Sequence, residues 1–161
     1  MQSDNRLAHM DEGAIAYPTA RFFKMLIGEV LTMTNEIDIP EVIAEVKEVH
    51  LRYEEALMAN DFDVLDELFW DNPRTLRYGP NGTLVSHAAI SAFRRSRKGK
   101  PAHRVVEDLR ITTFGRDFAV TNQESKRPQT GVVTRQSQTW IRTPQGWRIV
   151  SAHVSDQPAA P

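Results

Sequence analysis

The segment VVTRQSQTWIRTPQGWRIVSAHVS, which runs from Val132 to Ser155, decides the fold. It contains two long runs rich in β-branched and aromatic residues, Val132–Thr143 and Trp147–Ser155, separated by a turn that contains Pro and Gly. Such a turn between two strand-like runs predicts an antiparallel β-hairpin. Strands of about 9–12 residues must twist and curve, so we expect a bent sheet.

Two further strand-like runs precede this hairpin, His103–Thr113 and Phe118–Lys126. A Gly-containing turn joins them, and a loop over residues 127–131 leads into the hairpin. Short connections between consecutive strands are typical of an antiparallel meander. We therefore expect the C-terminal part of the chain to form four adjacent antiparallel strands.

Three helices are expected before the meander. Pro40 is favoured in the first helical turn and starts the first helix, which Asn60 ends. Asp61 and Ser86 are suitable N-cap residues for the second and third helices. The first helix has apolar residues at intervals of three and four, the pattern of one buried helical face. They are Val42, Ile43, Val46, Val49, Tyr53, Ala56 and Leu57.

A short hairpin separates the second and third helices. Arg74–Gly79 and Thr83–Val85 read as strands around the turn Pro80-Asn81-Gly82. Helices grouped beside an antiparallel sheet make an α+β fold, here one in which about three helices fill the concave side of one curved sheet. The open end of such a cone leaves a cavity, which is a usual ligand site.

Charge and length exclude several classes of protein. The 161 residues suit a single domain and carry 20 Lys and Arg against 21 Asp and Glu, a net charge of −1. This balance lacks the basic surplus of a nucleic-acid binder. The one dense basic run, Arg94–Lys100, lies at the end of the third expected helix, where cations complement the helix dipole. We expect it to be solvated.

Cysteine is absent, which excludes disulfides, zinc–thiolate sites and a cysteine nucleophile and fits a reducing cytoplasm. The histidines show no HxxxH or HExxH spacing, and the chain has no phosphate-binding or dinucleotide-binding glycine motif. We therefore expect no metal, no cofactor and a cytoplasmic location.

The N-terminal residues differ from the rest of the chain. Phe22–Leu31 is apolar, but it is about half the length of a bilayer span and is interrupted by two charged residues. No signal-cleavage pattern follows it, so neither a membrane segment nor a signal peptide is expected. Residues 1–36 are expected to be a disordered extension or the result of a start assigned before Met33, with a structured helix as the alternative. The domain then spans 37–156, followed by a frayed tail over 157–161.

The order of elements resembles the nuclear transport factor 2-like, or SnoaL-like, cone fold. Over about residues 37–155 the resemblance narrows to the AtzH-like family. That family includes a hydrolase of 1,3-dicarboxyurea in the cyanuric-acid pathway and a protein of oxalurate catabolism. The motifs that carry the resemblance are Ile39–Val42, Arg52–Leu57, Leu65–Trp70, Arg74–Gly79, Arg135–Trp140 and Gly146–Ser155.

Tyr53 and Arg77 match the family's proposed catalytic pair, a Tyr on the first helix and an Arg on the first strand. Without the resemblance, a Tyr on an apolar helix face is usually a core aromatic with one hydrogen bond, and a strand Arg usually faces solvent. Arg74 and Arg77 differ in strand parity, so one of the two is expected to face inward. An inward guanidinium needs a carboxylate or a substrate anion, and Arg74 is kept as a substrate-binding candidate.

Three more residues are substrate-binding candidates. His153 is in phase with Trp147 and Ile149 on the last strand, and in cone folds of this type that strand commonly lines the cavity. The alternative is a structural histidine with satisfied hydrogen bonds. Gln136 and Gln138 share one face of the preceding strand, and whether that face or the other points inward is left open.

The resemblance implies a hydrolase of C–N bonds in a small carboxylated urea such as 1,3-dicarboxyurea, in nitrogen-compound catabolism. Arg77 would hold a carboxylate, and Tyr53 would position water or transfer a proton. Because no strong base or nucleophile accompanies the pair, the alternative is a non-catalytic protein that binds a small anion or partners a pathway amidase, as in oxalurate catabolism. No nucleic-acid or membrane partner is expected.

A homodimer is also expected. Cone folds of this type often dimerise through the outer face of the sheet. The last strand has apolar residues on both parities, for example Ile149 and Val150, which is consistent with one covered face beyond the core.

Overall fold

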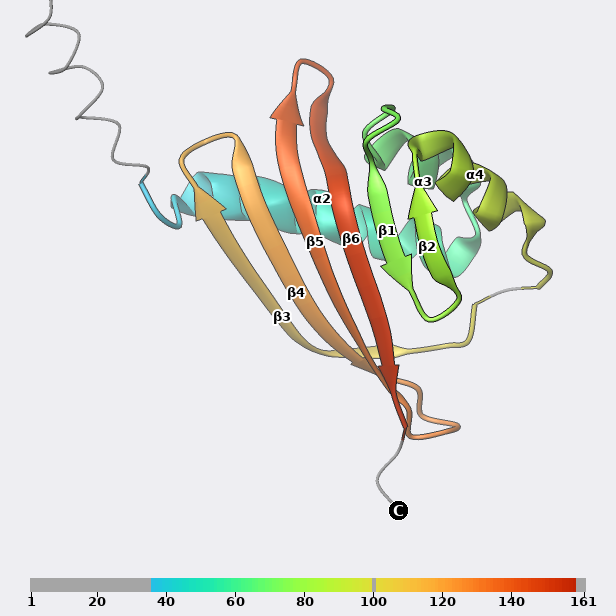
Figure 1. Ribbon diagram of the computed structural model, residues 1–161. Coiled ribbons are helices and arrows are strands. Elements are labelled where there is room, and N and C mark those ends of the chain that lie inside the picture. Colours follow the sequence, from blue (N-terminus) through green and yellow to red (C-terminus); the bar gives the residue numbers. More distant parts are fainter. Residues whose placement is uncertain (1–35, 100, 159–161) are drawn as a thin grey trace, which may run out of the picture. The chain divides into compact units, whose positions relative to one another are not determined.

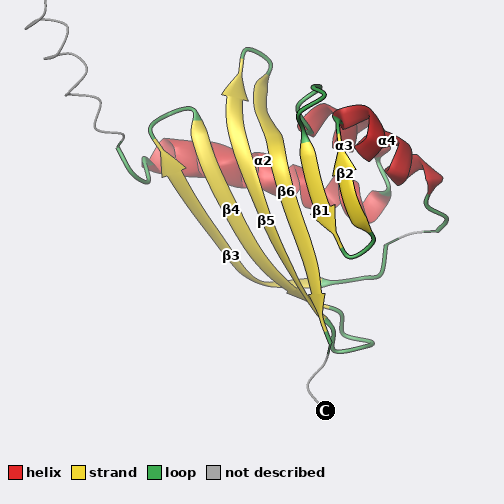
Figure 2. Ribbon diagram, viewed as in Figure 1, coloured by secondary structure: helices red, strands yellow, loops and turns green. Residues whose placement is uncertain are grey.

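The computed structural model describes residues 36–99 and 101–158 (Figures 1 and 2). The helices are α2 (Pro40–Ala59), α3 (Phe62–Leu68) and α4 (His87–Ser96). The strands are β1 (Leu76–Gly79), β2 (Gly82–Val85), β3 (Val105–Phe114), β4 (Phe118–Lys126), β5 (Val133–Thr143) and β6 (Gly146–Gln157).

These elements confirm the predicted α+β class and the predicted order of helices, short hairpin and meander. The expectations for the N-terminal extension fall on residues outside the described part of the chain, apart from Glu36. Of the expected frayed tail, Gln157 belongs to β6, and residues 159–161 are not described. No helix in the described ranges is long and apolar enough to cross a membrane.

The six strands form one sheet in the order β2-β1-β6-β5-β4-β3. All neighbours are antiparallel except β1 and β6, which run parallel. The short hairpin is therefore added to the meander beside the last strand of the chain. Figures 1 and 2 show the curved sheet in front and α2 crossing behind it.

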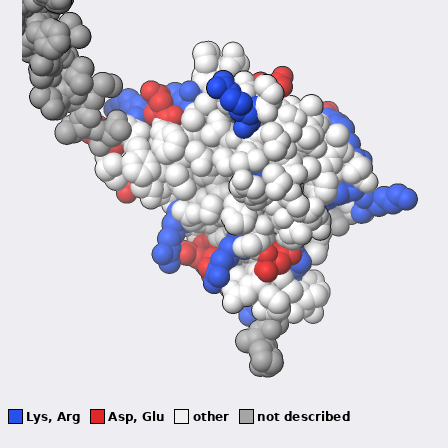
Figure 3. All heavy atoms as spheres, viewed as in Figure 1, with Lys and Arg blue, Asp and Glu red and all other residues white. Residues whose placement is uncertain are grey.

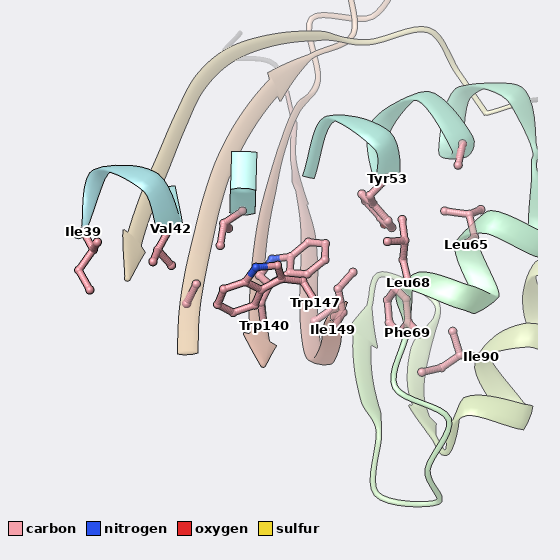
Figure 4. Close-up of a cluster of buried hydrophobic side chains, with 14 residues drawn as sticks. Ile39, Val42, Tyr53, Leu65, Leu68, Phe69, Ile90, Trp140, Trp147 and Ile149 are labelled. Carbon is pink, nitrogen blue, oxygen red and sulfur yellow. The ribbon is translucent and has the colours of Figure 1, made fainter. Parts of the chain in front are cut away.

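The core lies between the helices and the inner face of the sheet (Figure 4). The buried face of α2 follows the predicted stripe, with His50 as an additional polar member. Asn60 ends α2 in the left-handed conformation, with φ of 58°, which an Asn tolerates at a helix C-terminus. The same core cluster contains the buried residues Leu65, Leu68, Phe69, Trp140 and Ile149.

A β-bulge in β6 decides which of its side chains face the core. Ile149 and Ser151 pair with consecutive residues of β5, so Val150 is an extra residue. Before the bulge Ile149 is buried, and after it the next buried residue is Ala152. Since side chains otherwise alternate between the two faces, the extra residue reverses the inward parity of the rest of the strand.

Candidate functional site

A cavity of about 310 Å³ lies between α2, β1, α4, β5 and β6. This volume is at the lower end of the range for small-molecule sites. Five of the side chains that line it are arginines and one is an aspartate, so its wall has an excess of positive charge. These are Arg77, Arg94, Arg97, Arg104, Arg127 and Asp156.

Tyr53 reaches this cavity from α2. The residue is only 5% exposed, and its ring centroid lies 6.3 Å from that of Phe69 and 6.5 Å from that of His50. Its hydroxyl makes no hydrogen bond to the described residues, and the hydroxyl oxygen is not fully enclosed. Tyr53 therefore contributes a packed ring whose hydroxyl is available to a ligand.

Arg77 faces the same cavity from β1 because of the register of that strand with β6. Arg77 lies beside the inward residue Ala152, whereas the next residue, Tyr78, lies beside the exposed His153. The guanidinium lies over the ring of Phe93 at 5.5 Å, and among the described residues it has no carboxylate partner.

The electrostatic surroundings of Arg77 disfavour its charge. Burial lowers the pKa of the Arg77 guanidinium; the neighbouring Tyr53 raises that pKa, and the charge of Arg97 lowers it further. A bound anion would stabilise the charged form of a guanidinium in such surroundings. Gly79 provides room for it, because a Cβ at that position would lie 2.6 Å from Nη1 of Arg77.

Two other arginines of the wall are neutralised by the chain itself. Nη2 of Arg104 donates to both carboxylate oxygens of Glu54, at 2.7 and 2.6 Å, and the two side chains are 10% and 12% exposed. Nη2 of Arg127 donates to both oxygens of Asp156, at 3.1 and 3.0 Å. Asp156 also accepts a hydrogen bond from the hydroxyl of Thr134 at 2.8 Å.

The basic run at the end of α4 corrects one prediction. We expected Arg94–Lys100 to be a solvated helix end, but Arg94 is only 5% exposed and both Arg94 and Arg97 line the cavity. Arg94 lies four residues after the buried Ile90, so both occupy the inner face of the helix. That spacing was visible in the sequence and could have identified Arg94.

Arg74 and His153 are not part of the cavity wall. Arg74 is exposed, lies 5.6 Å from the ring centroid of Trp70 and donates to the side chain of Asn72. His153 is exposed on the outer face of the sheet, with its ring centroid 5.9 Å from that of Tyr78. The expected inward orientation of His153 is wrong because the bulge in β6 separates it from the phase of the core residues.

The two glutamines lie on the inward face of β5, which settles the parity that the sequence left open. Gln136 is 3% exposed and lines the cavity. Gln138 is 1% exposed and lies beyond the lining, where its Oε1 accepts a hydrogen bond from the hydroxyl of Thr121 at 3.3 Å. Only Gln136 is therefore placed to contact a ligand directly.

His50 was not a candidate in the sequence analysis. It is 1% exposed, and its Nε2 lies 2.6 Å from Oε1 of Gln123. Four buried nitrogens here have no hydrogen-bond partner in the described part of the chain: Nδ1 of His50, Nε of Arg104 and the Nε2 atoms of Gln136 and Gln138. Polar atoms of this kind are usually satisfied by ordered water or by a ligand. The described residues contain no group of three or more His, Cys, Asp or Glu side chains placed to hold a metal.

Comparison with known protein families gives one match. The family described as AtzH-like matches residues 35–159, a range that includes every residue of the cavity wall. The comparison with curated proteins found no match.

Several solved structures are similar in both sequence and fold. A protein of unknown function from the DUF3225 family of Pectobacterium atrosepticum is 43% identical, with a TM-score of 0.73, over 75% of this chain and 94% of that one. A cystatin-like fold protein from Burkholderia xenovorans is 39% identical, with a TM-score of 0.74, over 79% and 99%. A nuclear transport factor 2-like protein from Salmonella enterica is 27% identical, with a TM-score of 0.59, over 75% and 93%. The predicted nuclear transport factor 2-like fold is confirmed.

Proposed function

The chain belongs to the AtzH-like family, and from this premise we propose that it hydrolyses a C–N bond in a small carboxylated urea or amide. The observation that carries the proposal is that the unneutralised guanidinium of Arg77 and the available hydroxyl of Tyr53 line one small cavity. The candidate substrate is 1,3-dicarboxyurea, and the pathway is one of nitrogen-compound catabolism.

In this proposal Arg77 anchors the substrate. Its planar fork can donate two parallel hydrogen bonds to one carboxylate. The anchored substrate then exposes its carbonyl carbon to water near the Tyr53 hydroxyl, which positions the water or transfers its proton. The water oxygen bonds to the carbonyl carbon, the C–N bond breaks, and the leaving nitrogen takes up a proton.

Assays of the purified protein on 1,3-dicarboxyurea and on oxalurate-type compounds test this proposal. Turnover by the wild type is expected, with a large loss of kcat for Tyr53→Phe and a large rise in KM for Arg77→Ala. The proposal fails if neither compound is hydrolysed, or if both variants match the wild type.

A second candidate function is anion binding without catalysis, in a partner of an amidase. The observation that favours it is that the one carboxylate of the cavity wall, Asp156, is held by Arg127 and Thr134 and so is not a free base. Binding of small carboxylates in a thermal-shift screen without any turnover would support this candidate. The absence of a shift with every carboxylate would count against it.

A cytoplasmic homodimer completes the proposal. Figure 3 shows a large uncharged area over the strands, with charged side chains gathered around it. Exposed apolar side chains of the sheet, among them Tyr78 at 47% and Val85 at 58%, favour contact with a second copy. Light scattering at micromolar concentration is expected to give the mass of a dimer, and a monomer mass would contradict it.

A further inference from the structure

Arg94 and Tyr53 are neighbours around one aromatic ring. The guanidinium carbon of Arg94 lies 4.2 Å from the ring centroid of Phe69, and the ring of Tyr53 lies 6.3 Å from the same centroid. Figure 4 shows Tyr53 beside Phe69 in the core. Both Arg94 and Tyr53 line the cavity, so the charge of Arg94 belongs to the part of the wall that contains Tyr53.

The chain satisfies only part of the hydrogen-bonding capacity of Arg94. A guanidinium has five N–H donors, and one of them, on Nη1, donates to the carbonyl of Leu65 at 3.1 Å. The nearest carboxylate oxygen, Oδ1 of Asp66, lies 3.6 Å from Nη1, beyond hydrogen-bond range. Burial lowers the pKa of Arg94, whereas Tyr53 and Asp66 raise it. A buried cation with spare donors facing a cavity is suited to binding an anion.

We propose that Arg94 is a second anion-binding residue of this site, contacting the ligand beside the Tyr53 hydroxyl, and that Asp66 positions it. This rests on the proposed binding of a small anion in the same cavity. Arg77 and Arg94 then act from different elements, β1 and α4, on one bound ligand.

Asp66 is held in place by residues outside the cavity. Its Oδ2 accepts hydrogen bonds from the hydroxyl of Ser91 at 2.6 Å and from Nη2 of Arg95 at 2.8 Å. Its Oδ1 is buried, has no hydrogen bond in the described part of the chain, and is the oxygen 3.6 Å from Arg94. The carboxylate therefore draws the Arg94 guanidinium toward α3 without occupying its remaining donors.

Titration calorimetry with malonate as the probe tests the role of Arg94. Arg94→Met is expected to weaken malonate binding at least tenfold. Arg110→Met is the matched control, because Arg110 is exposed and among the described residues pairs only with Asp108, so this substitution removes the same charge away from the cavity. Arg94→Lys, which keeps the charge and most of the stem, is expected to retain binding within a few-fold. Circular dichroism and the thermal midpoint establish that each variant is folded.

A double-mutant cycle tests Asp66. Asp66→Asn is expected to weaken malonate binding a few-fold in the wild type and to add nothing in the Arg94→Met background, since its effect passes through Arg94. An additive effect would overturn its positioning role.

The outcomes separate this inference from the proposed function. Unchanged affinity in folded Arg94→Met, together with lost affinity in Arg77→Met, overturns the role of Arg94 alone. Should Arg94→Met be unfolded, Arg94→Lys decides: binding weakened as much as by Arg77→Met refutes the proposed charge contact, and retained binding supports it. No malonate binding by the wild type refutes both the anion site and its second arginine.

Discussion

The wall of the cavity divides into two regions that use the same residue type differently. In the first, Arg104 and Arg127 are each held by a carboxylate of the chain, Glu54 and Asp156. In the second, Arg77 lies against the ring of Phe93 and has no carboxylate partner among the described residues, while Arg94 lies against the ring of Phe69 with Asp66 at 3.6 Å, beyond hydrogen-bond range. In the first region carboxylates of the chain occupy the arginine donors, and in the second no carboxylate of the described residues accepts a hydrogen bond from Arg77 or Arg94, so their donors are left to a ligand.

The difference shows why counting arginines in a cavity does not identify a binding site. A buried cation with a carboxylate partner is part of the fold, because removal of either partner leaves an uncompensated buried charge. A buried cation that rests on an aromatic ring gains a smaller cation–π attraction and keeps donors free.

In the first region, where carboxylates hold the arginines, substitutions should lower the stability of the fold. Arg104→Met leaves the carboxylate of Glu54 buried and unpaired, so we expect the free energy of unfolding to fall by about 3 kcal/mol. Urea denaturation measures this. Adding Glu54→Gln to the variant should recover part of the loss, and a double variant no more stable than the single one would show that the pair is not the cause. Arg110→Met, at an exposed pair, is the control, with a loss under about 1 kcal/mol.

In the second region, substitutions should weaken the binding of an anion. Arg77→Met is expected to weaken malonate binding by about 2 kcal/mol, or roughly thirtyfold. Its stability without ligand should equal or slightly exceed that of the wild type, since a desolvated charge without a partner is removed. Calorimetry and urea denaturation of the same preparation give both numbers. A clear loss of stability would mean that Arg77 has a structural role like that of Arg104.

Substitution of Gly79 tests the second region with a smaller expected effect. A Cβ there would lie 2.6 Å from Nη1 of Arg77, so Gly79→Ala must displace the guanidinium. We expect a loss of about 1 kcal/mol in malonate binding, the size of one hydrogen bond. In an Arg77→Met background the same substitution should have no effect on affinity. An equal loss in both backgrounds would place its cause elsewhere.

The smallest effect concerns the dependence of stability on pH. Burial raises the pKa of Asp66, but the hydrogen bonds from Ser91 and Arg95 and the charges of Arg94 and Arg95 outweigh this and hold the pKa below its ordinary value. Because the pKa is lower in the folded state, the ionised carboxylate contributes stability at pH values above its ordinary pKa. This contribution is lost as the pH falls through the pKa of the folded state.

Asp66→Asn should therefore have a flatter stability curve than the wild type between about pH 5 and pH 2, by at most about 1 kcal/mol. Urea denaturation across this range measures it. Parallel curves for the two proteins would show that Asp66 does not gain from its ionised partners.

The sequence predicted the features that depend on local pattern. The apolar stripe of α2 placed Tyr53 inward, whereas the parity argument for Arg74 and Arg77 assumed a strand that begins at Arg74, and β1 begins only at Leu76. The structure selects Arg77 through the pairing of β1 with β6, a contact between residues far apart in the chain.

The features that were missed depend on such distant contacts. The bulge at Val150 is a mismatch in pairing between two strands, which neither strand shows alone, and it turned His153 outward. The spacing of Arg94 from Ile90 places it on the inner face of α4, but the sequence of α4 alone does not show the groups that bury its charge, Leu65 of α3 and Phe69, the C-cap residue of α3. Buried arginines cannot be separated from solvated ones by composition when the groups that bury them come from another element.

The parallel pairing of β1 with β6 also affects how the protein is made. Leu76–Tyr78 of β1 pairs with Ser151–His153 of β6. One edge of β1 therefore has its partner strand only after almost the whole domain has left the ribosome. Contacts between such distant segments slow folding, and an unpaired strand edge can associate with other chains in the meantime. Chains that stop before β6 would lose this partner of β1, so the binding wall is completed among the last steps of synthesis.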